Sequence, residues 1–146
     1  MIDILLPLFE RDLNTLEKEI TAYSNEDLMW LKEGQVNNSA GTLTLHLCGN
    51  MQHFIGAVLG DTGYVRNRTA EFELRLLREE LLKEIQATRS IVLSTLQELE
   101  ESTLKQTYPI EVFGRPMETG FFLAHLHGHL TYHLGQISYH RRLLDR

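Results

Sequence analysis

The segment Thr119–Arg146, TGFFLAHLHGHLTYHLGQISYHRRLLDR, carries the strongest structural signal in this chain. Its apolar residues recur at spacings of three and four, which is the pattern of a helix with one buried face. Arg141, Arg142 and Arg146 suit the negative end of a helix dipole. We therefore predict a long amphipathic helix from about Thr119 to the C-terminus, with a buried face made of Phe122, Leu126, Leu130, Ile137 and Leu144.

Three earlier segments show the same periodicity and predict three more long helices. The first runs from about Ile4 to Ile20, and the second from about Ala40 to Leu59, after the suitable N-cap Ser39. The third would run from about Ala70 to Glu101. Four such helices bury their apolar faces best against one another. We therefore expect residues 1–146 to form one all-α domain, a four-helix bundle. The buried face of the third helix would be Leu74, Leu77, Leu81, Ile85, Thr88, Val92 and Leu99.

The connections are less regular. Ser24 is a suitable N-cap for a short helical turn that ends at Leu31, and Gly60–Gly63 would end the second long helix. The link between the first two long helices is long enough to be a crossover, which leaves the bundle topology open. In Gln106–Met117 the apolar period changes to two, which predicts an extended segment or small hairpin before the last helix, and the only extended segment in the chain.

Composition and charge narrow the class of protein. The chain has 146 residues, the length of a single domain, and 14 Lys and Arg against 20 Asp and Glu give a net charge of −6. Such a charge disfavours nucleic acid as a partner. Cys48 is the single cysteine and cannot form an intrachain disulfide. No apolar run approaches the roughly 20 residues of a membrane span, and the start MIDILLPLFERD lacks the basic region of a secretory signal. We expect a soluble cytoplasmic domain without membrane or nucleic-acid partners.

The histidines are the clearest functional signal, because five of the seven lie in the last predicted helix. At about 100° per residue, four of them share one border of the apolar stripe, with His133 deepest, whereas His127 points to the other side. His129 and His133 are one turn apart, so their imidazoles are able to converge on one cation. The alternative is a row of half-buried polar residues at the core edge. The four histidines on the border are His125, His129, His133 and His140.

A further ligand has to come from another helix, and His46 lies at the matching border of the Ala40–Leu59 stripe. Asn50, one turn later, is suited to support it by a hydrogen bond. His53 lies further from the stripe, so we expect it to be solvated, and Cys48 points away as a small filler. If His46 and the pair on the last helix bind a metal, each imidazole should donate its other ring N–H to an oxygen acceptor.

Several stretches of this sequence are similar to a known superfamily. NSAGTLTLHLCGN at residues 38–50, RNR at 66–68, EF at 71–72 and HLTYHLGQI at 129–137 resemble a branch of the DinB-like superfamily. The resemblance covers nearly the whole chain in element order, and the His-x-x-x-His-x-Gly-Gln box is its most specific part. It implies a four-helix bundle, often dimeric, with a divalent metal, typically zinc or nickel, on three histidines. In this chain those three are His46, His129 and His133. His125 and His140 are not in the implied triad.

The resemblance also suggests a class of activity. Similar proteins include transferases and isomerases that use a low-molecular-weight thiol such as bacillithiol, mycothiol or glutathione, whereas many others, including the matched branch, have no established activity. Three neutral histidines leave an open metal position, the catalytic pattern for zinc. We therefore predict a metal-dependent thiol S-transferase or hydrolase that acts on a small electrophile. His125 is the candidate general base, although a core-edge or exposed role is the alternative. The candidate pocket residues are Trp30, Asn50, Arg66 and Gln136.

A second hypothesis requires no catalysis. A metal-binding bundle in which the ion fastens two helices together would fill a structural or stress-response role with the same histidines. The two hypotheses differ in whether a pocket reaches the metal. The Leu-rich third helix offers spare apolar surface for a twofold contact, so we expect a homodimer. The metal, the thiol and the electrophile stay open at this point.

Overall fold

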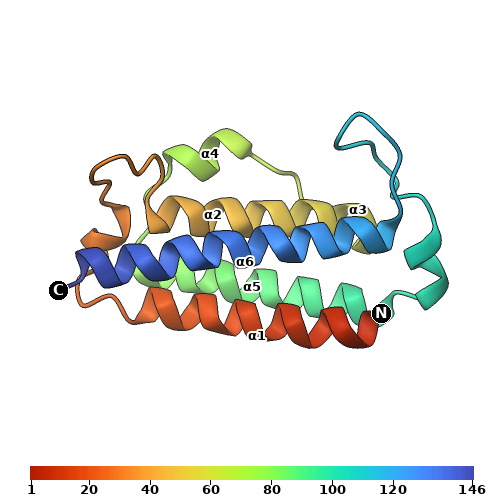
Figure 1. Ribbon diagram of the computed structural model, residues 1–146, viewed down its shortest axis with the longest axis horizontal. Helices are drawn as coiled ribbons and strands as arrows, with labels where there is room; N and C mark the ends of the chain where they lie inside the picture. The colour runs from red at the N-terminus through yellow and green to blue at the C-terminus, as the bar shows by residue number, and fades with distance from the viewer.

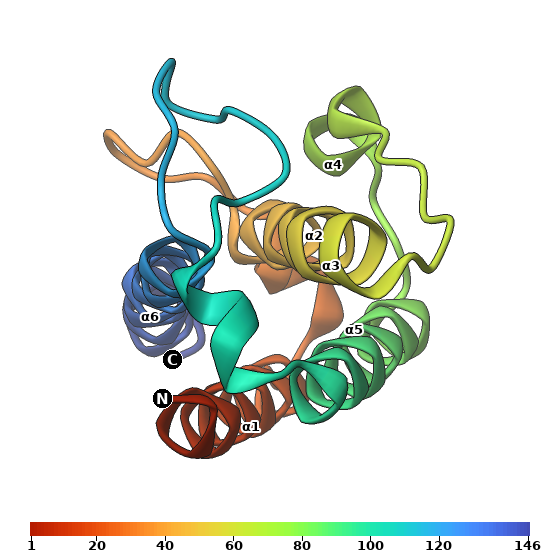
Figure 2. The ribbon, with the colours of Figure 1, turned by 90° about the vertical axis from the view of Figure 1, so that its right-hand side faces the viewer.

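Four long helices form an all-α bundle in the computed structural model, which describes residues 1–146 (Figures 1 and 2). They are α1 (Ile2–Thr21), α2 (Ala40–Met51), α5 (Arg78–Glu98) and α6 (Thr119–Leu144). Both α1 and α2 pack against α5 and α6. The predicted all-α class and four-helix bundle are confirmed, and no helix has the length and hydropathy needed to cross a membrane.

The topology places the crossover later than the sequence suggested. Helices α1 and α6 run in one direction, and α2 and α5 run in the other (Figure 1). The connection from α1 to α2 contains the short 3₁₀ helix η1 (Glu26–Trp30) and returns antiparallel. The connection from α2 to α5 joins two parallel helices, so it travels back along the whole bundle and carries the short helix α4 (Arg68–Glu73).

The predicted second helix is continuous but not regular. Helix α2 passes into a π-helical segment, η2 (Gln52–Ala57), and then into α3 (Val58–Gly60). Ser39 caps its start as predicted, since its side chain accepts the Thr42 N–H at 3.2 Å. The end also follows the prediction, because Asp61 and Gly63 adopt positive φ angles of 49° and 75°. In η1, however, Asn25 is the N-cap, and the Ser24 side chain instead bonds Asp145.

The predicted single helix from Ala70 to Glu101 is wrong. The chain leaves α4 at Leu74 and enters α5 only at Arg78, with extended backbone at Leu74 and Leu77. The Leu77 N–H is bonded by the Glu80 carboxylate at 2.9 Å, which begins a new helix there. Leu74 and Leu77 are 50% and 62% exposed rather than buried, because α4 packs on α2. The helical spacing of apolar residues in the sequence therefore continues through residues 74–77, although packing interrupts the helix there.

The extended segment before α6 closes as a small hairpin-like loop without a sheet. Helix α5 is followed by the 3₁₀ helix η3 (Glu101–Lys105). Thr107 and Glu118 then form an isolated antiparallel bridge, and the Tyr108 N–H donates to the Met117 carbonyl at 2.8 Å. The predicted hairpin is thus present, and no strand is formed. The prediction that it is the only extended segment is wrong, because the backbone is also extended at Leu74 and Leu77.

The core lies along the inner faces of the four long helices. Phe122, Leu126, Leu130 and Ile137 of α6 are at most 2% exposed, as the stripe predicted. Ordinary apolar packing holds the bundle together. The polar side chains that reach inward from α2 and α6 are therefore exceptions that require an explanation.

Candidate metal centre

Three histidines from two helices meet at one point of the bundle. His46 of α2 and His129 of α6 approach to 3.2 Å between their Nε2 atoms, and His133 Nε2 lies 3.1 Å from His129 Nε2. One ligand atom from each residue lies within 4.8 Å of the other two. His129 and His133 are one turn apart on α6, so both imidazoles leave the helix on the same side. These are the three residues that the helical wheels and the resemblance brought together.

The orientation of His46 is set by helix α4. The His46 Nδ1 lies 3.1 Å from Glu71 Oε1, and Glu71 is 6% exposed. Arg66 donates to both carboxylate oxygens, from Nε at 2.8 Å and from Nη2 at 2.9 Å. Because the His46 Nδ1–H donates to this carboxylate, its Nε2 keeps a free lone pair directed at the other two histidines.

Close packing between α2 and α4 brings Glu71 to this position. A Cβ on Gly49 would overlap the Glu71 carboxylate, so only glycine leaves room for it. Gly49 lies on α2, three residues after His46. The sequence prediction missed Glu71, because it treated residues 70–101 as one helix. Glu71 does occur in the EF stretch at 71–72 that carries the family resemblance. The helical periodicity, however, gave no indication that Glu71 would contact His46.

His133 and His129 differ in how they are supported. The His133 Nδ1 lies 2.7 Å from Gln136 Oε1, so its ring N–H donates to the amide oxygen and Nε2 is free for the centre. The His129 Nδ1 is buried and has no hydrogen-bond partner. The expectation that every imidazole has an oxygen partner therefore holds for His46 and His133 but not for His129, because no polar group of the bundle lies within hydrogen-bond distance of its Nδ1.

Burial favours the neutral forms of His129 and His46. The pKa of His129 falls to about 4, chiefly because burial penalises its charged form and secondarily because His133 and His46 lie beside it. The pKa of His46 is also lowered, since burial outweighs the favourable effect of Glu71. Neutral imidazoles with lone pairs on one point are the ligands that a borderline divalent cation prefers.

The remaining histidines lie outside the cluster. His125 is exposed, stacks on Phe122 with ring centroids 5.9 Å apart and makes no hydrogen bond. His140, at 8% exposure, is the most buried histidine of α6, which corrects the prediction that His133 lies deepest. Both of its ring nitrogens are used, by the Tyr23 hydroxyl at 2.7 Å and the Leu31 carbonyl at 2.8 Å. His140 therefore anchors the chain between α1 and α2.

His127 and His53 both lie outside the cluster, as the helical wheels predicted. His127 points to the other side of α6, where its Nε2 lies 3.0 Å from Asp12 Oδ2 of α1. The same oxygen accepts the Thr131 hydroxyl at 3.1 Å, and Arg11 donates to the other oxygen at 2.7 Å. His53 packs on the Phe54 ring and is not a member of the cluster. This Asp12 network was not predicted from the sequence, since nothing in the periodicity of α1 distinguishes Asp12 from a surface acid.

A groove of about 500 Å³ opens beside the cluster. His133 and Gln136 lie in its wall, together with residues 35–38 of the loop before α2. Of the four predicted pocket residues, only Gln136 lines this groove. Trp30 instead covers Gly41, where a Cβ would lie 2.6 Å from its ring. Asn50 is buried with an unpartnered Oδ1, and Arg66 is used by Glu71.

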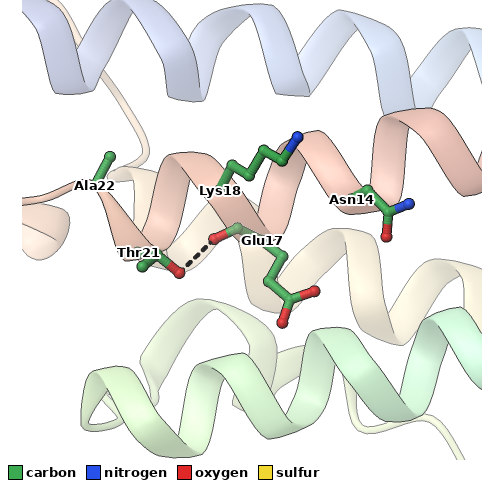
Figure 3. Close-up of a pocket in the computed structure, with 5 residues that line it drawn as sticks. All are labelled: Asn14, Glu17, Lys18, Thr21 and Ala22. Carbon is green, nitrogen blue, oxygen red and sulfur yellow. Dashed lines mark hydrogen bonds between the residues drawn. The ribbon is translucent and has the colours of Figure 1, made fainter.

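A second depression, of about 460 Å³, has no relation to the histidines. All five residues that line it lie on or directly after α1, as Figure 3 shows, and the Thr21 hydroxyl there is used by the Glu17 carbonyl at 2.8 Å. The groove at His133 is therefore the one that matters for the chemistry of this site.

A four-helix bundle with a partly buried three-histidine cluster at one side belongs to the class of helical proteins that build a potential metal site from facing helices. The chain belongs to the family described as "Protein of unknown function (DUF1572)", whose sequence profile matches residues 3–146.

One solved structure has a similar fold. The fold is similar to that of a crystallised DinB-like protein from Bacillus cereus ATCC 10987, with a TM-score of 0.72 and 17% sequence identity. The match covers 90% of this chain and 85% of that chain. The DinB-like fold expected from the resemblance is therefore confirmed. No curated protein matches the chain.

Proposed function

We propose that His46, His129 and His133 bind one divalent ion, zinc or nickel. The observation that carries the proposal is the convergence of three Nε2 atoms, with the Nδ1 atoms of His46 and His133 held by Glu71 and Gln136. Fixed tautomers of this kind are what metal-binding histidines require. The lowered pKa of His129 also favours a cation, because an unprotonated ring nitrogen keeps its lone pair available for a metal.

The open position of such an ion is the basis for an enzymatic role. Bound to three neutral histidines, the ion would lower the pKa of a water or thiol at its remaining position. The surrounding side chains would hold the ligand histidines in place and form the groove for a substrate. Glu71 and Arg66 hold His46, Gln136 holds His133, and the groove at His133 admits a molecule of small size.

We propose metal-dependent transfer of a low-molecular-weight thiol to a small electrophile, or hydrolysis of such an electrophile, at that position. The thiol is suggested by the DinB-like resemblance, and bacillithiol, mycothiol and glutathione are the compounds to test. His125 is the proposed general base, because its ring is exposed, forms no hydrogen bond within the protein and lies one turn before His129.

The test begins with the metal. Protein purified without a metal-affinity resin, then stripped and reconstituted, should contain one zinc or nickel ion per chain by elemental analysis. His129→Ala and His133→Ala should lose that ion, whereas His53→Ala, which changes a histidine outside the cluster, should keep it. The reconstituted protein is then assayed with the three thiols and model electrophiles. Turnover that survives complete metal removal would contradict the catalytic proposal.

The alternative is a metal-binding bundle without catalysis. It is favoured by the fact that the three histidines join α2 to α6, so that an ion would fasten two helices together. In that case, metal removal would lower the melting temperature while no thiol or electrophile is consumed. A complete lack of divalent metal after reconstitution would exclude both hypotheses.

A further inference from the structure

The groove beside His133 has an unusual chemical character for a site that would accept a small thiol. Its walls contain no Lys, Arg, Asp or Glu. Its polar side chains are three amides of the loop before α2, on Gln35, Asn37 and Asn38, and the amide, two tyrosines and two histidines that α6 contributes. Glutathione carries carboxylates, and a carboxylate in a groove of this kind would lose water without meeting a cation.

Several polar groups of the groove are unused, although both ring nitrogens of His140 are hydrogen-bonded. No hydrogen bond within the protein involves the side chains of Gln35, Asn37 or Asn38, and the hydroxyls of Tyr132 and Tyr139 likewise have no protein partner. Gln136 uses its oxygen for His133 Nδ1 at 2.7 Å, which leaves its NH₂ group free. These side chains are therefore available donors and acceptors for a neutral molecule.

Apolar and aromatic surface lies between these groups. Leu43 forms the buried floor, and Val36 and Leu143 are 48% and 55% exposed at the edges. The rings of Tyr132 and Tyr139 are 66% and 65% exposed and stand one above the other on α6, seven residues apart. One guanidinium on the same helix, that of Arg142, stacks 4.8 Å from the centre of the Tyr139 ring and bonds the Ser138 carbonyl.

We infer that this groove binds a neutral ligand rich in hydroxyl or amide groups, with a short apolar part, and discriminates against anionic ligands of the same size. The ligand would lie along α6 with its reacting end at His133. The inference rests on the proposed function for the role of that ligand as a substrate or co-substrate. The charge preference itself rests only on the walls of the groove.

The test uses two probes that differ by one charge, N-acetyl-S-methylcysteine amide, which is neutral, and N-acetyl-S-methylcysteine, which carries a carboxylate. Binding to the full chain is followed by nuclear magnetic resonance, from the side-chain NH₂ signals of Asn37, Asn38 and Gln136. In metal-free protein, we expect the neutral probe to bind about tenfold more tightly, because the walls of the groove offer the carboxylate no Lys or Arg partner. Equal or tighter binding of the carboxylate would overturn the inference, as would the absence of shifts with both probes.

A charge variant makes the test specific to the groove. Asn37→Lys places a cation in the wall, away from the three histidines, and should reduce or reverse the preference for the neutral probe. Gln97→Lys adds the same charge near the far end of α5, at the opposite end of the bundle, and should leave the preference unchanged (Figure 1). A preference that Asn37→Lys leaves intact would show that another surface binds the probes, and would overturn the inference.

The same experiment separates this inference from the proposed function, since it is run on metal-free and on zinc-reconstituted protein. If the reconstituted protein binds one ion per chain but the metal-free protein shows no probe preference, the metal site is retained and the inference about the groove is overturned. The expected preference in protein that binds no metal would support the groove and remove the proposed chemistry.

Discussion

At the scale of single residues, the site depends on hydrogen bonds that fix which ring nitrogen is free. Glu71 and Gln136 each accept one ring N–H, and Arg66 holds Glu71 with two bonds. The Glu71 carboxylate is buried and bonded to a guanidinium and an imidazole. The loss of any one of these groups should therefore lower the metal affinity, and the loss of one charged partner should also destabilise the fold, because it leaves the other charge buried without a partner.

Glu71→Gln tests this view directly. The amide keeps the size of the side chain but removes the charge that orients Arg66 and His46, so we expect metal affinity to fall by about 10- to 100-fold. Competition with a chelator of known affinity measures the change. Glu73→Gln, at an exposed position of the same helix, is the matched control and should leave affinity unaltered. Equal affinity in the Glu71 variant and the wild type would mean that Glu71 has only a structural role.

Asp12→Asn tests the second buried acid, which is 4% exposed. Burial raises the pKa of Asp12, but the bonds from Arg11 and Thr131 outweigh it and leave the pKa below the ordinary value of 3.8. A depressed carboxyl pKa stabilises the fold above the unfolded-state pKa, and that stability is lost as the pH falls through the folded-state value. Wild type should therefore lose stability as the pH falls below about 4.

In the Asn variant this acid-dependent part should be smaller, and stability at neutral pH should be lower by about 1–3 kcal/mol. Urea unfolding at neutral and acid pH measures both quantities. Identical pH profiles for variant and wild type would rule out Asp12 as a source of acid sensitivity.

At the scale of elements, the short helix α4 decides the geometry of the site. It packs on α2 and inserts Glu71 beside Gly49, which brings to His46 a residue 25 positions later in the chain. The break at Leu74–Leu77 is what permits this arrangement, because a continuous helix from Ala70 could not both cover α2 and follow α5. The crossover connection thus supplies a residue of the candidate site.

Gly49→Ala tests the contact between α2 and α4. The added methyl group would displace the Glu71 carboxylate, so we expect a loss of about 1–3 kcal/mol in stability together with weaker metal binding. Gly128→Ala is the control, because nothing lies within 4 Å of its Cβ position. There, helix propensity should raise stability by about 0.5–1 kcal/mol. Thermal unfolding and chelator competition measure the two effects, and a neutral Gly49→Ala would show that α4 adjusts freely.

At the scale of the whole molecule, the bundle leaves apolar surface uncovered around the crossover. Val65, Phe72, Leu74 and Leu77 are between 41% and 87% exposed along one stretch of chain. Exposed apolar residues that gather in one place are typical of interaction surfaces. The expected homodimer therefore has a candidate contact, made of leucines that periodicity had assigned to the core.

We expect the wild type to be a dimer in light scattering and the double variant Leu74→Glu with Leu77→Glu to be a monomer, because two buried charges without partners oppose association. Ile4→Glu, on α1 and 62% exposed, should remain dimeric. A monomeric wild type would make the homodimer prediction wrong, and a dimeric double variant would move the contact elsewhere.

Three features could be predicted from the residue pattern alone. They are the four long amphipathic helices, apart from the break in the third; the start of α6 at Thr119; and the side of each helix on which its histidines lie. These features depend on spacing along one helix, and a period of 3.6 residues records them locally. The meeting of His46 with His129 and His133 was predicted from matching stripe borders together with the family resemblance.

The contacts between distant segments became visible only in the folded molecule. The partners of the histidines, Glu71 for His46 and Asp12 for His127, lie 25 and 115 positions away in the sequence. Three further features depend on which helix packs beside which. They are the break between α4 and α5, the pairing of α1 with α6, and the groove at His133, whose walls lack Lys, Arg, Asp and Glu. Contacts between distant segments leave no periodic trace in either segment, so the pattern of one helix does not reveal them.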